Sequence, residues 1–270
     1  MSIIGLITDF GLTDNYAGVM KAVISSINPN VAIIDICHNI EPGNIYQAAF
    51  QLFTGYKYFP PNTIFVVVVD PGVGSSRKAI LIKKEPYFFI GPDNGVFSYI
   101  LDNQDISNEI INITNEFYFL KNISKTFHGR DIFSPVAAEL AKDFNYSKFG
   151  TPLNETPVSL EIKKVNITRN FIKGFIIYTD KFGNIMTNIS AELLSAYQIK
   201  EIKTGNIIIS SISKTFMDVE PGKLVAISGS SGLLEIAVNM GNARELIFGT
   251  ETVINESVYC YFCTQKQGPL

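Results

Sequence analysis

Short apolar runs rich in β-branched residues alternate with segments of helical period over the first half of the chain. Ile3–Ile7 is an apolar run of strand length, and Thr63–Val69 is the clearest of its kind. Between them, apolar side chains recur at spacings of three and four residues, which predicts a helix over 16–27 that Asn28–Pro29 ends. Such alternation is typical of an α/β domain with a largely parallel central sheet.

The pattern of apolar and polar positions changes after the Gly/Pro-containing segment 150–153. Segments of helical period precede it, and strand-like runs follow it. Before this break, the pattern predicts further strands at 31–36, 79–82, 87–90 and 109–113, and helices at about 45–53 and 134–142. Beyond it, the pattern predicts strands at 159–165, 171–178, 206–211, 224–228 and 233–238. We therefore expect an N-terminal α/β domain over 1–155 and a smaller C-terminal all-β domain over 165–270.

Composition and charge narrow the possible partners. The 46% hydrophobic content supplies a core, and 25 acidic against 22 basic residues give a formal net charge of -3. A nucleic-acid-binding protein typically has an excess of basic residues, which this chain lacks. The longest apolar runs are strand-sized, whereas a membrane-spanning helix needs about 20 apolar residues, and the N-terminus lacks the basic region of a signal peptide. We expect a cytoplasmic protein without nucleic-acid or membrane partners.

The three cysteines do not predict a disulfide framework or a metal site. Cys260 and Cys263 are spaced as a pair, but no second pair completes a four-ligand zinc site. Two thiols on a C-terminal strand are the favoured interpretation.

Polar clusters follow three of the predicted strands. They are Thr8 to Asp14, Asp35 to His38, and Asp70 to Arg77. In parallel α/β sheets, ligands bind outside the carboxyl ends of the strands, so all three clusters can share one rim. The Asp70 loop is glycine-rich, but it has the signature of neither a P-loop nor a dinucleotide site. Taken alone, it is as consistent with an Asp-Pro-Gly turn as with a functional site.

The remaining candidates have local explanations. His128 precedes a glycine in a loop, and it becomes a catalytic candidate only if it meets Asp70. Arg130 and Asp131 are typical of a local ion pair with a helix-start acid. In the C-terminal half, residues 180–184 and 228–232 are typical of turns between strands.

Together, these segments resemble the S-adenosyl-L-methionine (SAM) hydroxide adenosyltransferases, or SAM hydrolases, which are relatives of the SAM-dependent fluorinase and chlorinase. The resemblance covers almost the whole chain and preserves the family's order of motifs. It rests on seven segments: Thr8–Gly11 with Asp14, Asp35–His38, Val69–Gly74 with Arg77, Gly91–Gly95, Thr126–Asp131, Asp180–Asn184 and Ser230–Ala237.

The resemblance implies an N-terminal α/β domain joined to a C-terminal β-barrel, in a homotrimer with sites at the subunit interfaces. It places the family's catalytic residues at Asp70, Arg77 and His128. The implied reaction is hydrolysis of SAM to adenosine and L-methionine, with SAM as the substrate and with no cofactor or metal.

Binding roles follow from the same resemblance. Asp9 would accept hydrogen bonds from the ribose hydroxyls, since a carboxylate only accepts. The remaining residues fall into three groups by the part of SAM they would bind: Asp14 and Asp180 for the amino group, Ser230 and Ser231 for the carboxylate, and Phe182, Asn184, Phe216 and the Met240 backbone for the adenine.

Departures from the halogenases favour water as the nucleophile. Those enzymes carry tyrosine in place of Asp70, the fluorinase has serine at Gly129, and this chain lacks the insertion that the fluorinase has between its early motifs. A buried carboxylate near the halide position would also repel an anion.

The chemistry demands a positioned nucleophile more than a strong base. Attack at the ribose C5′ expels a neutral thioether from a sulfonium, so no acid is needed for the leaving group. Water, with a pKa of about 15.7, is too weak an acid for prior deprotonation by a carboxylate or an imidazole. We hypothesise that Asp70 and His128 orient water and take its proton as the C–O bond forms, with Arg77 fixing Asp70. Which of the two receives the proton stays open, as does a hydroxide-like nucleophile held by Arg77 and His128.

Three other functions remain. Asp9, Asp14, His38, Asp70 and His128 can be interpreted as the ligands of a metallohydrolase, although none has a compact ligand spacing. A chlorinase-like activity and a non-catalytic SAM- or adenosine-binding module are the others.

Overall fold

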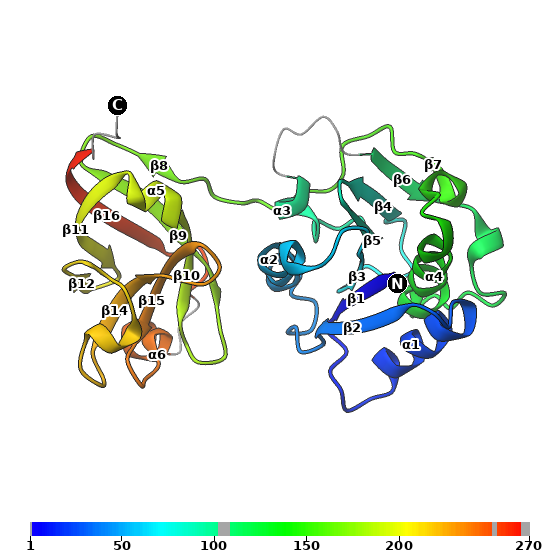
Figure 1. Ribbon diagram of the computed structural model, residues 1–270, viewed down its shortest axis with the longest axis horizontal. Coiled ribbons are helices and arrows are strands. Elements are labelled where there is room, and N and C mark those ends of the chain that lie inside the picture. Colours follow the sequence, from blue (N-terminus) through cyan, green and yellow to red (C-terminus); the bar gives the residue numbers. More distant parts are fainter. Residues whose placement is uncertain (1, 102–108, 250–252, 266–270) are drawn as a thin grey trace. The chain divides into compact units, whose positions relative to one another are not determined.

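The computed structural model describes residues 2–101, 109–249 and 253–265 of the chain (Figure 1). The chain divides into two compact units, Met1–Leu160 and Glu161–Leu270. No helix among the described residues is long and apolar enough to cross a membrane.

Unit 1 is built on a seven-stranded sheet whose core is parallel. The order is β2-β1-β3-β5-β4-β6-β7. The parallel strands are β1 (Ile3–Thr8), β2 (Ala32–Cys37), β3 (Ile64–Val68) and β5 (Tyr87–Pro92). Antiparallel pairing adds β4 (Ala79–Lys84), β6 (Glu109–Ile113) and β7 (Gly150–Pro152).

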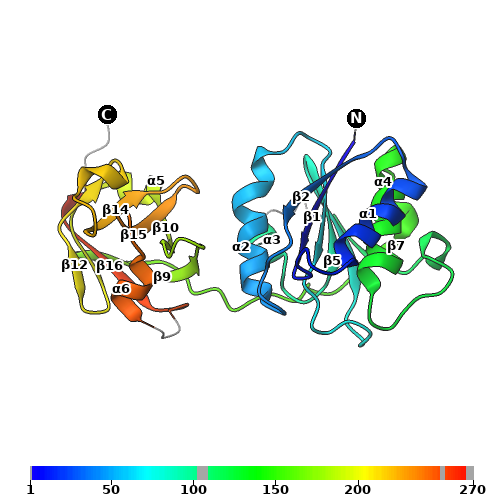
Figure 2. The same cartoon turned by 90° about the horizontal axis from the view of Figure 1, so that it is seen from below.

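Helices cover both faces of this sheet (Figure 2). On one face lie α1 (Tyr16–Ile27) and α4 (Ser134–Asp143), and on the other lie α2 (Ile45–Gly55) and α3 (Ser98–Leu101). Because successive residues of a strand point to opposite faces, Val66 packs with the α1 and α4 side while Val67 packs with the α2 side. β3 is therefore buried along its whole length, which explains its unbroken apolar sequence.

The short helical segments of unit 1 are single turns, with one exception near the site. They are η1 (Tyr56–Tyr58), η2 (Glu116–Tyr118) and η4 (Tyr146–Phe149). The exception is η3 (Gly129–Phe133), a π-helical segment that leads directly into α4.

Unit 2 is a nine-stranded, nearly closed, barrel-like sheet. Its order is β12-β11-β16-β9-β10-β15-β14-β13, with β8 paired to β9. The strands are β8 (Asn166–Ile167), β9 (Phe171–Thr179), β10 (Ile185–Ser190), β11 (Tyr197–Thr204), β12 (Ile207–Ile209), β13 (Ile212–Ser213), β14 (Leu224–Ser228), β15 (Leu233–Val238) and β16 (Ser257–Gln265). Short helices α5 (Ala191–Ser195) and α6 (Ala243–Phe248) and the single turn η5 (Phe216–Asp218) lie between strands.

The predicted fold class is confirmed, and several elements match to the residue. The helix over 16–27 and the strands over 109–113, 224–228 and 233–238 have the predicted bounds. The strand predicted at 159–165 is wrong, because the segment forms no ladder. Side chains bind its backbone instead: Ser98 Oγ accepts from Leu160 N at 2.8 Å, and just before it Asp93 Oδ1 accepts from Val158 N at 2.8 Å.

Candidate functional site

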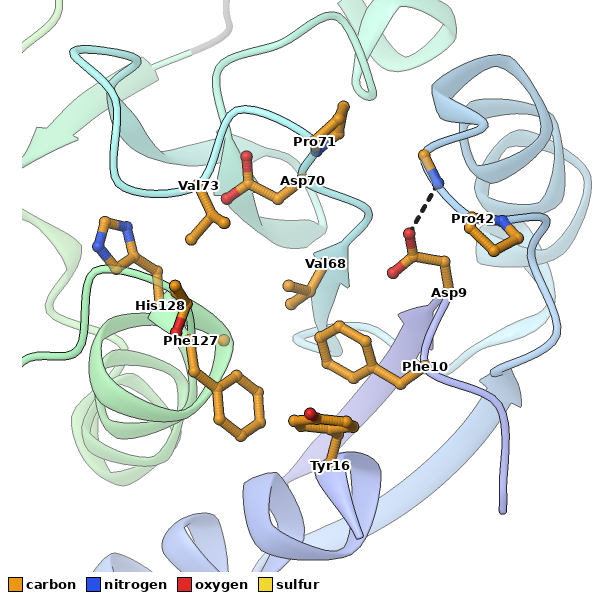
Figure 3. Close-up of a pocket in the computed structure, with 13 residues that line it drawn as sticks. Asp9, Phe10, Tyr16, Pro42, Val68, Asp70, Pro71, Val73, Phe127 and His128 are labelled. Carbon is orange, nitrogen blue, oxygen red and sulfur yellow. Dashed lines mark hydrogen bonds between the residues drawn. The ribbon is translucent and has the colours of Figure 1, made fainter. Parts of the chain in front are cut away.

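The polar clusters that follow β1, β2 and β3 meet at one edge of the unit 1 sheet. Thr8 pairs with Val68, and Ile7 pairs with Cys37, so the three strands end side by side. A cavity of about 520 Å³ opens at this edge, a size in the range of small-molecule sites. Its walls come from these strand ends and from the segment before α4 (Figure 3), and they comprise Asp9, Phe10, Tyr16, Pro42, Gly43, Val68, Asp70, Pro71, Val73, Thr126, Phe127, His128 and Gly129.

Arg77 joins Asp70 and His128 into one hydrogen-bonded group. Its Nε donates to Asp70 Oδ1 at 3.0 Å, its Nη2 donates to Asp70 Oδ2, and Nη2 also contacts His128 Nδ1 at 2.8 Å. The Asp70 and Arg77 side chains are only 4% and 10% exposed. A guanidinium that forks onto a buried carboxylate holds both groups in a fixed orientation.

This contact fixes the tautomer of His128. An arginine is always protonated and can only donate, so Nδ1 of His128 must accept and the ring proton of the neutral form resides on Nε2. Burial, reinforced by the positive charge of Arg77, lowers the pKa of His128, although Asp70 and Asp131 oppose this. The lowered pKa favours the neutral form of His128, which carries its proton on Nε2.

Two local features place these side chains. In the Asp70 loop, Val73 N donates to Asp70 O at 3.1 Å, and Gly74 has a φ of +76°. A Cβ on Gly74 would run into the backbone of Lys125, so only glycine allows this loop to approach the segment before His128. His128 itself occupies the N-cap position of the π-helical segment η3, and such segments frequently mark functional sites.

Arg130 and Asp131 form the local ion pair that the sequence indicates. Arg130 Nε donates to Asp131 Oδ1 at 2.6 Å, and Asp131, which is fully buried, also accepts from Ser124 N at 2.7 Å. This pair stabilises the turn behind His128 and adds no group to the cavity wall.

Asp9 faces the same cavity, and its surroundings are held by a second network. Gly43 N donates to Asp9 Oδ2 at 2.9 Å. Beneath Asp9, the buried His38 contacts Thr8 Oγ1 through Nδ1 at 2.8 Å and Asp35 Oδ1 through Nε2 at 2.9 Å. Thr8 Oγ1 in turn accepts from Phe10 N at 3.3 Å.

The other predicted binding residues are placed on surface turns. Asp14 is exposed just before α1 and does not line the cavity. In unit 2, Asp180 closes the β9–β10 turn, since it accepts from Phe182 N, from Asn184 N and from Asn184 Nδ2 at 2.9–3.0 Å. The predicted amino-group and adenine residues of this turn are thus bound to one another.

The carboxylate and stacking candidates lie elsewhere in unit 2. Ser230 and Ser231 form the β14–β15 turn, and the buried Ser231 Oγ has no hydrogen-bond partner among the residues that the structure describes. Met240 follows the opposite end of β15 in a left-handed turn with φ +55°. Phe182, Phe216 and Met240 are all exposed. The predicted binding roles of these residues stay predictions.

Glu235 is a buried group of unit 2 that the sequence analysis missed. It is 6% exposed, and burial together with the negative charge of Asp180 raises its pKa. Glu235 is visible in the sequence as the one charged residue of an otherwise apolar run, and the structure shows that this strand is buried along its whole length. Phe10, Tyr16 and Phe127 were also missed as a group, although Phe10 and Phe127 lie within the motifs singled out and Tyr16 begins the predicted helix.

The five residues of the metallohydrolase hypothesis are engaged in other contacts or lie apart. His38 binds Thr8 and Asp35, while Asp70 binds Arg77. Within the described ranges, no three His, Cys, Asp or Glu side chains are grouped to hold a metal ion.

The chain combines an α/β unit, whose strand ends carry a hydrogen-bonded Asp–Arg–His group beside a cavity, with a barrel-like unit that follows it in the sequence. Family models match both parts: the SAM hydroxide adenosyltransferase N-terminal domain over residues 4–150 and the C-terminal domain over 174–251. The chain belongs to the SAM hydroxide adenosyltransferase family.

Individual relatives agree with this assignment. The chain is 38% identical over 260 residues to the (R)-S-adenosyl-L-methionine hydrolase of Methanocaldococcus jannaschii, covering 92% of each protein. A fluorinase from Nocardia brasiliensis is 24% identical over 271 residues, covering 88% of this chain and 90% of that protein. The crystal structure of an uncharacterized conserved protein from Thermotoga maritima superposes with a TM-score of 0.87 at 39% identity, covering 95% of this chain and 99% of that one.

Proposed function

We propose that this protein hydrolyses SAM to adenosine and L-methionine. The observation that carries the proposal is the pair Asp70 and His128 in the wall of a cavity of suitable size, joined to each other by hydrogen bonds through Arg77. Its relatives named as SAM hydrolases support the same reaction.

The reaction is a displacement at the ribose C5′. The water oxygen forms a bond to C5′, the C5′–S bond breaks with its electron pair passing to sulfur, and the attacking water gives up one proton. Because the leaving thioether is neutral and stable, the protein needs to orient the nucleophile and accept that proton. Alignment of this kind contributes a large part of a catalysed displacement.

The tautomer of His128 supports a division of the two roles between His128 and Asp70. Its Nε2–H can donate to the oxygen of the attacking water, whereas Nδ1 is engaged by Arg77 and cannot take a proton without breaking that contact. Asp70 lines the cavity, and each carboxylate oxygen keeps a second lone pair beyond its bond to Arg77. Asp70 therefore receives the proton as the C–O bond forms, and His128 orients the water.

The remaining roles extend this proposal. Asp9 binds the ribose hydroxyls from the cavity wall, and the residues predicted in unit 2 bind the adenine and the methionine portion. The reaction needs no metal ion, since His128 orients the water and Asp70 accepts its proton. A homotrimer remains a prediction of the family resemblance, and a cytoplasmic location remains a prediction of the sequence.

Incubation of the purified protein with SAM tests the proposal, with product analysis by chromatography. EDTA and chloride are varied, and His128→Ala and Asp70→Asn are assayed beside the wild type. Adenosine and methionine formed together, unaffected by chelator and lost in both variants, is the expected result. Full activity in Asp70→Asn would contradict the assigned proton acceptor.

Other products would identify the alternatives. Formation of 5′-chloro-5′-deoxyadenosine with chloride would indicate a chlorinase. Loss of activity with EDTA would indicate a metallohydrolase, and binding of SAM or adenosine without turnover would indicate a binding module.

A further inference from the structure

Three aromatic rings pack together in the wall of the cavity, and the catalytic assignment above uses none of them. The ring centroids of Phe10 and Tyr16 are 5.5 Å apart, those of Phe10 and Phe127 5.6 Å, and those of Tyr16 and Phe127 5.2 Å. We call Phe10, Tyr16 and Phe127 the aromatic cluster. All three line the cavity, and Tyr16 is 46% exposed.

We infer that the aromatic cluster is a subsite for the positively charged sulfonium group, through which the site selects a sulfonium over a neutral thioether. The inference rests on the proposed function, because it takes the substrate to be a sulfonium. The face of an aromatic ring carries partial negative charge and attracts a cation placed within about 6 Å of the centroid.

The geometry of the displacement places the sulfur beside the aromatic cluster. Displacement requires the entering oxygen, C5′ and the leaving sulfur to lie in line, so sulfur is on the side of C5′ away from the water. In Figure 3, Val68 lies between Asp70, which would hold the water, and the rings of Phe10 and Tyr16, while Phe127 adjoins His128. With water beside Asp70, the sulfonium faces the rings.

The charges of the cavity wall also favour a cation. The lining residues include the carboxylates of Asp9 and Asp70 but neither lysine nor arginine, and Arg77 lies behind Asp70. Arg130 stacks over Phe127 at 5.1 Å, where its charge is held by Asp131. Within residues 2–101, 109–249 and 253–265, no cation stacks on Phe10 or Tyr16.

Such a subsite distinguishes the substrate from the products. The bond-breaking step converts the sulfonium into the neutral thioether of methionine, so the attraction to the rings is present before the reaction and absent after it. Loss of the rings is then expected to raise KM for SAM more than it lowers kcat/KM, because the charge is already declining in the transition state.

Two inert ligands and a matched pair of variants test this inference. The ligands are S-adenosyl-L-homocysteine, a neutral thioether, and the SAM analogue in which a protonated N-methyl tertiary amine replaces the sulfonium, used below the pKa of that amine. Tyr16→Leu removes a ring, and Tyr16→Phe keeps the ring while removing the hydroxyl. Affinities are measured by calorimetry on the full chain, and thermal melting checks that each variant is folded.

We expect Tyr16→Leu to weaken binding of the cationic ligand about 5- to 30-fold and binding of the thioether less than about 3-fold, with Tyr16→Phe preserving the wild-type ratio. Phe127→Leu provides a second test with the same expectation. Equal weakening of both ligands, or a change in Tyr16→Phe as large as in Tyr16→Leu, would overturn the inference. Because neither ligand turns over, wild-type binding without SAM hydrolysis would refute only the proposed function.

Discussion

Replacing Arg77 with lysine or methionine separates the charge of this residue from its geometry. The guanidinium donates to both oxygens of Asp70, to His128 Nδ1, and through Nη1 to Lys78 O at 3.3 Å. Arg77→Lys keeps the positive charge but offers a single nitrogen, which cannot reproduce the planar fork. Arg77→Met removes the charge and leaves the Asp70 carboxylate buried without its partner.

The structure sets the size of both effects. Arg77→Lys loses at least one hydrogen bond between charged groups, which corresponds to about 1.5–3 kcal/mol. Arg77→Met breaks an ion pair whose side chains are 10% and 4% exposed, and removing one partner of such a pair costs about 3–5 kcal/mol. We expect the free energy of unfolding to fall in the order wild type, Arg77→Lys, Arg77→Met.

Urea unfolding at neutral pH measures this order, and NMR titration of the histidines supplies a second readout. The chain has only two histidines, so the His128 signals can be assigned by comparison with a His128 variant. Because the charge of Arg77 helps to lower the pKa of His128, Arg77→Met should raise that pKa while Arg77→Lys should change it less. An Arg77→Met protein within about 1 kcal/mol of wild type, with the His128 pKa unchanged, would refute the coupling inferred from these contacts.

Three further predictions concern the same edge of the sheet. Burial and the charge of Arg77 lower the pKa of His128 below its usual value, so the unfolded chain binds a proton at higher pH than the folded one. The free energy of unfolding should therefore decrease as the pH falls from about 7 to about 5, and His128→Gln should reduce this slope in urea titrations at several pH values. Gly129→Ala should cost about 1–3 kcal/mol in thermal unfolding, because its Cβ would lie 3.1 Å from Cγ1 of the β-branched Val68 and 3.2 Å from Met20 Sδ. Gly18→Ala, with open space around it, should be neutral or slightly stabilising. Thr8→Val should lower the free energy of unfolding by about 1–3 kcal/mol and raise KM for SAM, since the Thr8 hydroxyl links His38 to the loop that carries Asp9. Thr8→Ser keeps the hydroxyl and should behave as wild type in both assays. An unchanged KM in Thr8→Val would contradict this link.

Some elements could be predicted from the sequence because local pattern and burial agree there. The helix 16–27 has one buried stripe, formed by Ala17, Met20 and Ile24, and its sequence repeats with the same period. β10 and β11 were not predicted, because polar side chains interrupt their apolar runs. Thr187 of β10 is fully buried and is satisfied by its bond to Leu234 O at 3.1 Å, a partner from a strand 47 residues away.

The functional site, too, could be predicted from the sequence only in part. Asp9, Asp70 and His128 could be singled out because polar residues after buried strands, or beside a glycine before a helix, are visible in the sequence. The sequence could not rank these residues as functional. Asp70, for example, is as consistent with a turn as with a site until the structure shows Arg77 bound to it. The aromatic cluster joins residues from the end of β1, the start of α1 and the segment before η3, and no periodicity connects them.

The sequence by itself determined the two-part architecture and the candidate residues, because the spacing of apolar side chains dictates which segments bury a face and where each segment ends. Tertiary structure decided which candidates act together. Three parallel strands end at one edge and bring Asp9, Asp70 and Arg77 to it, while the π-helical segment brings His128 from 51 residues beyond Arg77. The proton position on His128 depends on that contact across space, and a hydrogen bond between residues so far apart leaves no local signal in the chain.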